Sequence, residues 1–271
     1  MLYRVKEVSF AVALTAGLCR IASAAAPLPP GVTSDEVKCE SGTGKALSKF
    51  VGSKSSCAQK CLAAARKTSG PYTDCFAPYG GATATCILDP AKGAEAKAKA
   101  AIVKACTTDC PECYAASNCS TGNPFVSTTE SLLDLQGPSV YCTENGAGTP
   151  SKTEAKCEDS TGKSLGKFVA AKSKCYDKCN QSMVKAKIPT GSCNPPIPSD
   201  AATATCITTA ESKTAAAIDK ACSTAGANPA CYDGSLLRPN TGAGWVALVE
   251  SIVDGQVPQI ACGSPSGAFL E

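Results

Sequence analysis

Apolar residues recur every three or four positions in two long stretches of the chain, which predicts two long amphipathic helices. The stretch in the second half has one polar gap, at Lys172, and its apolar face is made of Cys157, Thr161, Leu165, Phe168, Cys175, Cys179 and Met183. The stretch in the first half repeats that face with Cys39, Thr43, Leu47, Phe50, Cys57 and Cys61. Most of the intervening lysines fall off the stripe, as on the solvated side of a helix.

The two stretches belong to a longer internal repeat. Thr43-Gly-Lys-Ala-Leu-Ser-Lys-Phe-Val51 matches Thr161-Gly-Lys-Ser-Leu-Gly-Lys-Phe-Val169, and Ala82–Ile87 matches Ala202–Ile207. The period of about 118 residues has the length of a domain rather than of a short solenoid unit. We therefore expect two tandem domains, copy 1 (residues 36–142) and copy 2 (residues 154–262).

Each copy should contain a helical hairpin and a third helix. An alanine-rich helix is expected from about Asp200 to Cys222, with Ser199 as a candidate N-cap. In copy 1, Asp89-Pro90 interrupts the matching segment and predicts a kink or a restart. A shorter apolar segment follows, around 125–133 in copy 1 and 245–253 in copy 2. The predicted fold class is all-α: two tandem disulfide-stapled helical-hairpin domains, each with a third short helix.

The hairpins restrict disulfide pairing, because residues that face each other across antiparallel helices have a nearly constant sum of residue numbers. In copy 1, Cys86 fits Cys61 as well as Cys57, and only the comparison with copy 2 favours Cys57. The expected bridges are Cys39–Cys106, Cys57–Cys86, Cys61–Cys75, Cys110–Cys119 and Cys113–Cys142 in copy 1, and Cys157–Cys222, Cys175–Cys206, Cys179–Cys193 and Cys231–Cys262 in copy 2. All of them lie within one copy, so we expect each copy to fold alone.

The first 24 residues have the pattern of a secretory signal peptide. Arg4 and Lys6 precede an apolar run over 8–18, and Ala22-Ser-Ala24 is a suitable cleavage site, which predicts a mature chain starting at Ala25. The alternative is a buried helix of the mature domain. No other apolar run approaches the roughly 18 residues that a membrane span needs, so no transmembrane segment is expected after cleavage. The remaining expected boundaries are a Pro-rich leader at 25–35, a linker at 143–153 and a tail at 263–271.

The cysteine count indicates a cellular compartment, and the charged residues exclude one class of partner. Cleavage would remove Cys19 and leave eighteen cysteines, which suits nine bridges in an oxidising compartment and predicts a secreted or periplasmic protein. The net charge of +3 would fall by two to +1, and Arg66 and Arg238 would be the only arginines. Nucleic acid is therefore not expected as a partner. The expected partner is an extracellular protein or surface ligand of unknown identity.

The chain contains no histidine, which removes the commonest general base and most catalytic zinc sites. Serine catalysis with a lysine base, or a carboxylate pair, stays formally possible, but no spacing singles one out. Ser160-Thr-Gly-Lys-Ser164 is similar to half of a phosphate-binding loop and lacks its leading glycine, where Cys157 stands. We expect no enzyme activity, no catalytic or metal-binding residues and no cofactor.

Cys110-Pro-Glu-Cys113 resembles the redox motif of thioredoxin-fold oxidoreductases, in which Cys110 would attack and Cys113 would resolve. No βαβ pattern surrounds it, and copy 2 has no counterpart of Cys110 or Cys119. Cys106, Cys110, Cys113 and Cys119 could alternatively form a four-thiolate metal site. Both alternatives need reduced thiols, so disulfides are the favoured interpretation. Asn118 and Asn180 begin glycan sequons.

The order Cys, Gly-Lys, Lys-Phe-Val, Cys and Lys-Ala-Cys, over roughly 70 residues of each copy, resembles cysteine-rich helical repeats of secreted bacterial proteins with no assigned function. The resemblance implies an extracellular or periplasmic address and no activity. Our interpretation is a secreted, non-catalytic, disulfide-rich protein that acts as a binding or structural module. The alternatives are a thiol-disulfide oxidoreductase that uses Cys110 and Cys113, or a thiolate metal-sequestering protein.

Overall fold

The structure is a computed structural model that describes residues 33–68, 72–142, 150–185, 187–189, 191–196, 198–224, 226–260 and 262. Within these residues the chain is built of α-helices and one short 3-10 turn, η1 (Thr73–Cys75), which confirms the expected all-α class. The expected signal peptide, its cleavage site, most of the leader, much of the linker and the tail lie outside the described residues. None of the described helices is long and apolar enough to cross a membrane.

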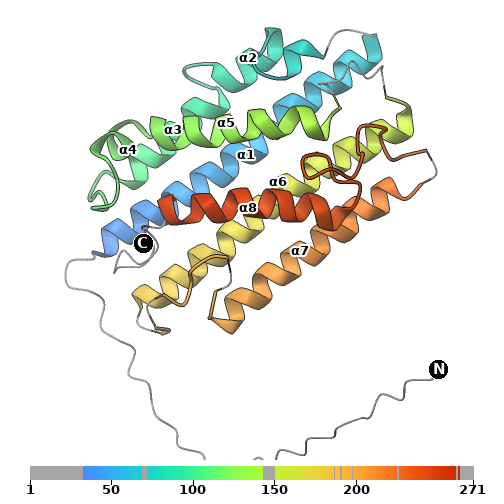
Figure 1. The fold of residues 1–271 in the computed structure, drawn as a ribbon. Helices are drawn as coiled ribbons and strands as arrows, with labels where there is room; N and C mark the ends of the chain where they lie inside the picture. Colours follow the sequence, from blue (N-terminus) through green and yellow to red (C-terminus); the bar gives the residue numbers. More distant parts are fainter. Residues whose placement is uncertain are drawn as a thin grey trace, which may run out of the picture.

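Both copies form the expected hairpin (Figure 1). The helix α1 (Ser34–Thr68) is followed by α2 (Gly81–Leu88) and α3 (Ala94–Ala105), and α6 (Lys152–Val184) is followed by α7 (Ala201–Cys222). The break between α2 and α3 lies at Asp89-Pro90 as expected, because proline cannot continue the helical hydrogen bonding. The N-cap of α7 is Asp200 rather than Ser199, since its carboxylate accepts from the Thr203 amide at 2.8 Å.

The hairpins pack through α1 and α6, which run antiparallel. The Lys45 ammonium near the start of α1 lies 3.7 Å from Asp177 near the end of α6. At the other end, the Arg66 guanidinium contacts Glu158 at 2.7 Å and Asp159 at 2.9 Å. The start of α1 therefore contacts the end of α6, and the end of α1 contacts the start of α6.

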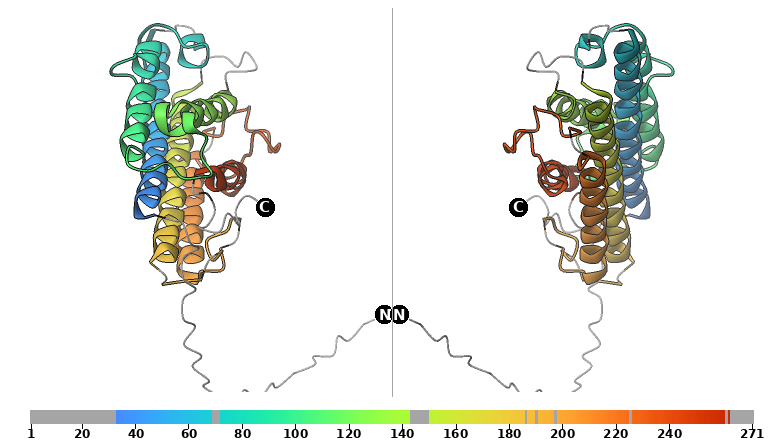
Figure 2. Two further views of the ribbon diagram at one scale, coloured as in Figure 1. Left: turned by 90° about the vertical axis from the view of Figure 1, so that its left-hand side faces the viewer. Right: turned by 90° about the vertical axis from the view of Figure 1, so that its right-hand side faces the viewer.

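The third helices cross one face of this layer, where α5 (Asn123–Val140) and α8 (Gly242–Ile260) lie on the same side of the long helices (Figures 1 and 2). A short helix, α4 (Ala116–Thr121), precedes α5. The end of α5 reaches copy 2. There the hydroxyl of Tyr141 occupies the space that a side chain at Gly162 would need. The end of α8 reaches copy 1, where Ile260 lies against Gly44. Each third helix thus connects its own hairpin to the hairpin of the other copy.

This exchange overturns two of the nine expected disulfides. The structure joins Cys113 to Cys262 and Cys142 to Cys231, instead of Cys113 to Cys142 and Cys231 to Cys262. The reason is the length of α5, about 27 Å at 1.5 Å per residue, which separates Cys142 from Cys113 and carries it to copy 2. The expectation that no bridge joins the copies is therefore wrong.

The other seven bridges agree with the prediction. They are Cys39–Cys106, Cys57–Cys86, Cys61–Cys75, Cys110–Cys119, Cys157–Cys222, Cys175–Cys206 and Cys179–Cys193. Each of these joins elements of one hairpin or of the loop that follows it, so the register inside a copy decides the pairing.

Two equivalent tyrosines fix the ends of the exchanged helices. Tyr114 donates to the carbonyl of Ile260 at the end of α8, and Tyr232 donates to the carbonyl of Val140 at the end of α5, at 2.8 Å. Both tyrosines directly follow a bridging cysteine. The buried clusters combine both copies accordingly: Cys262 packs with Cys39 and Phe50, and Val140 and Tyr141 pack with Cys157, Tyr232 and Trp245.

Candidate functional site

A largely apolar pocket lies between the two copies. It is partly open to solvent and has a volume of about 170 Å³. Small residues of α1 and α6 form much of its floor: Gly44, Ser48, Ser55, Ala58, Gly162, Gly166 and Ser173. Apolar residues of α5 and α8 form its walls: Leu132, Leu133, Val249, Ile252, Val253, Val257 and Ile260. Glycine, serine and alanine at these positions of α1 and α6 leave space that larger side chains would fill.

Equivalent positions of the repeat line the pocket from opposite sides. Gly44 and Gly162, Leu47 and Leu165, Val51 and Val169, Ser55 and Ser173, and Leu132 and Ile252 are such pairs. The sequence repeat alone could not reveal the pocket, because its lining comes from both copies and depends on how they pack.

Copy 1 also contributes polar groups to the lining, among them Lys54, Tyr79 and Asp134. The Lys54 side chain is 6% exposed, and its Nζ lies 2.7 Å from Asp134 and 3.0 Å from Glu130. The hydroxyl of Tyr79 donates to the same Asp134 oxygen, and the Tyr79 ring centre lies 5.1 Å from Nζ. One side of the apolar pocket is therefore bordered by the ion pair of Lys54 and Asp134, and Tyr79 donates a hydrogen bond to this pair.

Copy 2 repeats this cluster around Lys172, the residue that interrupts the predicted apolar stripe. Its side chain is fully buried, and Nζ lies 2.5 Å from Glu250 and 2.7 Å from Asp254. The hydroxyl of Tyr176 donates to Asp254 at 3.2 Å, and the Phe168 ring centre lies 6.0 Å from Nζ. Sequence reasoning missed both clusters, although the acids lie four residues apart on each third helix.

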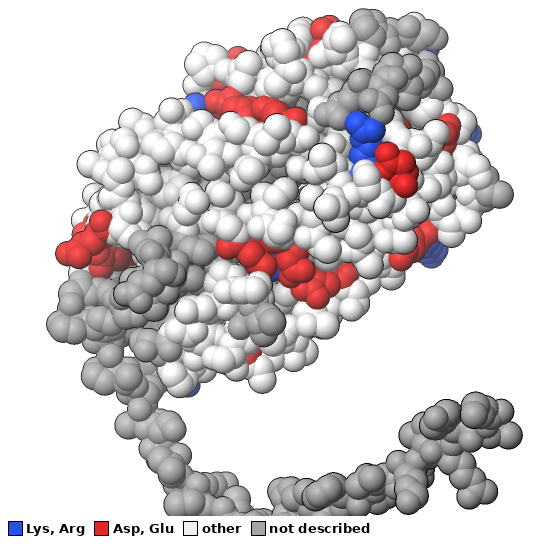
Figure 3. Space-filling model, viewed as in Figure 1, with Lys and Arg blue, Asp and Glu red and all other residues white. Residues whose placement is uncertain are grey.

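A further carboxyl group from the hairpin lies beside each cluster, namely Glu95 in copy 1 and Glu211 in copy 2. Figure 3 shows acidic groups beside α5 and beside α8, separated by uncharged surface. Burial and then the hydrogen bond with Glu250 raise the pKa of Glu211 to about 7. Burial opposes ionisation of Glu250 as well, yet the hydrogen bonds from Glu211 and Lys172 keep its pKa below the usual range. In copy 1, burial raises the pKa of Glu130, and the neighbouring Glu95 adds to the shift.

The raised pKa of Glu211 predicts that stability falls as the pH rises. The unfolded group titrates near 4.5 and the folded group near 7, so between these values the folded state binds more protons. The stabilisation is complete below about pH 4.5 and is lost as the pH rises through 7. We expect the melting temperature to fall between pH 5 and 8, and to fall less in Glu211→Gln. The exposed Glu112→Gln serves as the control, and equal slopes for both variants would contradict this assignment.

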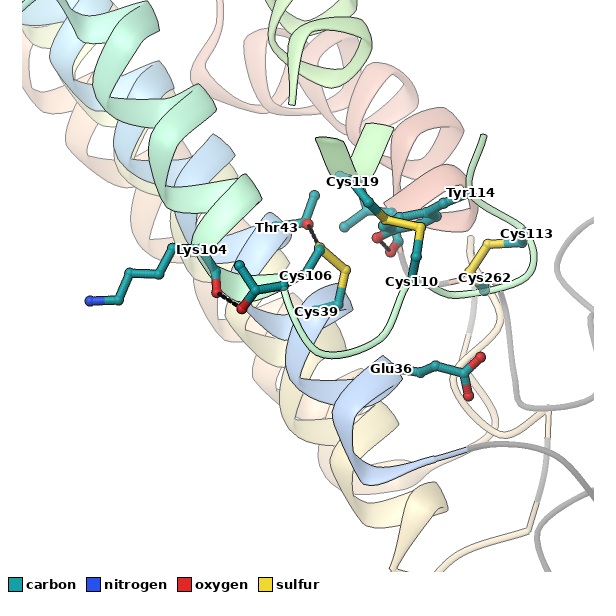
Figure 4. Close-up of a disulfide and its surroundings, with 12 residues drawn as sticks. Glu36, Cys39, Thr43, Lys104, Cys106, Cys110, Cys113, Tyr114, Cys119 and Cys262 are labelled. Atoms are coloured by element: carbon teal, nitrogen blue, oxygen red, sulfur yellow. Dashed lines mark hydrogen bonds between the residues drawn. A yellow bond between two sulfur atoms is a disulfide. The ribbon is translucent and has the colours of Figure 1, made fainter. Parts of the chain in front are cut away.

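The cysteines of the predicted redox motif are placed in separate bridges (Figure 4). Cys110 is joined to Cys119 and Cys113 to Cys262, so the two motif cysteines do not form the disulfide that thioredoxin-type exchange requires. The sulfurs of Cys39, Cys106 and Cys119 lie within 4.8 Å of one another. Every cysteine in the described ranges is in a disulfide, so these sulfurs are not thiolates.

Comparisons with protein-family models, with curated proteins and with solved structures found no match for this chain. Asn118 and Asn180, the two sequon asparagines, lie half-buried on α4 and α6.

Proposed function

We propose that this protein is a secreted or periplasmic, non-catalytic module that binds a small apolar molecule in the pocket between α5 and α8. Two observations support the proposal. The nine disulfides in the part of the chain that the structure describes suit an oxidising compartment. The pocket has apolar walls and a few convergent polar groups, which is the usual composition of a small-molecule site.

The size of the pocket limits the ligand. An apolar cavity of about 150 Å³ in another protein stays dry and takes up benzene, and the pocket here has a volume of about 170 Å³. The ligand should therefore have an apolar body the size of an aromatic ring or a short alkyl chain. A single polar group on it could face Tyr79 and the ion pair of Lys54 with Asp134.

Burial of apolar surface would favour binding. A bound apolar molecule removes its own surface and part of the apolar lining of the pocket from water, which contributes about 25 cal/mol per Å² of apolar surface buried.

Filling the pocket with a side chain should abolish binding without unfolding the protein. A Cβ added at Gly166 meets only the hydroxyl of Ser55, at 3.8 Å, so Gly166→Leu can project into the space. Leucine in place of glycine inside a helix is also favourable by about 0.8 kcal/mol. Gly52→Leu is the matched control, because Gly52 is an exposed helical glycine with no neighbour within 4 Å and does not line the pocket.

The experiment is titration of the folded protein with toluene and with 1-hexanol, followed by calorimetry and by the melting temperature. We expect both probes to bind wild type and Gly52→Leu, and to raise their melting temperatures. Gly166→Leu should keep its fold and lose both effects. Absence of binding to wild type, or equal binding to Gly166→Leu, would contradict the proposed function.

A further inference from the structure

The cluster around Lys172 places an amine, two carboxyl groups and a phenol in contact. The Lys172 Nζ lies 2.7 Å from Asp254 Oδ1 and 2.5 Å from Glu250 Oε1. Tyr176 donates its hydroxyl hydrogen to the same Asp254 oxygen, at 3.2 Å. Lys172 and Tyr176 come from α6 and the acids come from α8, so the cluster links two separate elements.

The side chain of Lys172 is unusually deeply buried for a lysine. Its side chain has no exposed surface, and the ring centres of Phe168 and Tyr176 lie 6.0 and 5.9 Å from Nζ. No surface of this side chain is left for water to compete with the carboxyl groups that contact it. An uncharged lysine amine is a nucleophile.

The two acids differ in ways that assign them different roles. Asp254 is the less exposed, at 13% against 28% for Glu250, and only Asp254 receives the tyrosine hydrogen bond. Burial raises the pKa of Asp254, which favours the protonated acid that an amine can attack. The hydrogen bonds from Glu211 and Lys172 lower the pKa of Glu250, which favours a carboxylate that can accept a proton.

We propose that Lys172 and Asp254 condense into a side-chain amide bond that covalently joins α6 to α8. The ion pair of ammonium and carboxylate and the product pair of amide and water have the same atoms and the same charge. One proton moves from the Lys172 ammonium to the Asp254 carboxylate, and the freed Nζ lone pair attacks the carbon of the resulting carboxylic acid. The Tyr176 hydroxyl stabilises the oxyanion that forms. The Glu250 carboxylate then takes a second proton from the nitrogen and passes it to the departing hydroxyl group, which leaves as water.

The equivalent cluster in copy 1 provides an ionic comparison within the same chain. Lys54 lies at the wall of the pocket, and its partner Asp134 is 24% exposed, so solvent stabilises the charged pair there. Lys54 is therefore expected to keep a free amine. Cleavage by trypsin after Lys54 then shows that the protease acts on the denatured chain.

The test is a peptide map of the full chain after denaturation, reduction and alkylation, which removes the disulfides. The expected result is one covalently linked pair of tryptic peptides that contains Lys172 and Asp254, lighter by one water than the sum of its parts. Trypsin should not cleave after Lys172, because the acylated lysine is uncharged. Water loss confined to the Asp254-Gly255 peptide, as a cyclic imide would give, would overturn the proposal, and so would free Lys172 in folded wild type.

Two variants separate the chemistry from the fold. Glu250→Gln keeps the lysine and the aspartate and removes the proton acceptor, so it should lose the linked peptide. Lys172→Arg keeps the positive charge and cannot form the bond, because arginine stays protonated. If Glu250→Gln retains the linked peptide at the wild-type yield, the assigned role of Glu250 is overturned.

Discussion

Copy 2 produced alone, as residues 150–262, is expected to fail to form a cooperatively folded domain. Its Trp245 and Tyr232 pack in a buried cluster that includes Leu62, Val140 and Tyr141 of copy 1. The isolated chain would expose this surface to water. It would also leave Cys231 and Cys262 without their partners.

The two lost bridges indicate how much stability the isolated copy should lose. They close loops of 89 and 149 residues, and the chain-entropy model gives about 5 kcal/mol for each. A typical domain has a total stability of about 5 to 15 kcal/mol. Thermal unfolding followed by near-ultraviolet circular dichroism would show whether Trp245 sits in a fixed environment. Refolding together with residues 33–142 should restore the transition, whereas a cooperative transition of copy 2 alone would contradict the shared core.

For the ionic form of the cluster, before any amide bond joins Lys172 to Asp254, Lys172→Met is expected to destabilise the protein by about 3 kcal/mol, the lower part of the range for breaking a buried ion pair. The substitution leaves Glu250 and Asp254 facing each other without the cation. Both acids keep some contact with solvent, at 28% and 13% exposure, which is why the lower value applies.

The matched control is Lys174→Met, because Lys174 is an exposed lysine on the same helix. Urea unfolding of both variants gives the free energies directly. Changing Glu250 to glutamine and Asp254 to asparagine as well should recover part of the loss, since the unpaired charges are then gone. Equal stability of Lys172→Met and Lys174→Met would show that the buried cluster contributes nothing.

The hairpins and the bridges inside them could be predicted because they depend on register within one copy. The sum of residue numbers identifies Cys157 with Cys222 and Cys39 with Cys106 without any knowledge of how the copies pack. Cys142 and Cys262 occupy equivalent positions, so no sequence comparison can decide which of them joins Cys113. The direction and length of α5 decide it in the folded protein.

The buried lysines were missed for a related reason. Lys172 interrupts the apolar stripe of α6, and its partners lie 78 and 82 residues later on a different helix. The tyrosines add a second difficulty, because Tyr176 lies on α6 while Tyr79 lies in the loop before α2. Copy 1 has Ala58 at the position equivalent to Tyr176, so comparing the copies does not pair the two tyrosines.

The most direct test of the exchanged architecture is a disulfide map of the unreduced protein cut at the exposed Lys152, between the copies. The structure predicts that the halves stay joined under denaturing, non-reducing conditions, through Cys113–Cys262 and Cys142–Cys231. Separation of the halves without reductant, with Cys113 bonded to Cys142 and Cys231 bonded to Cys262, would contradict it.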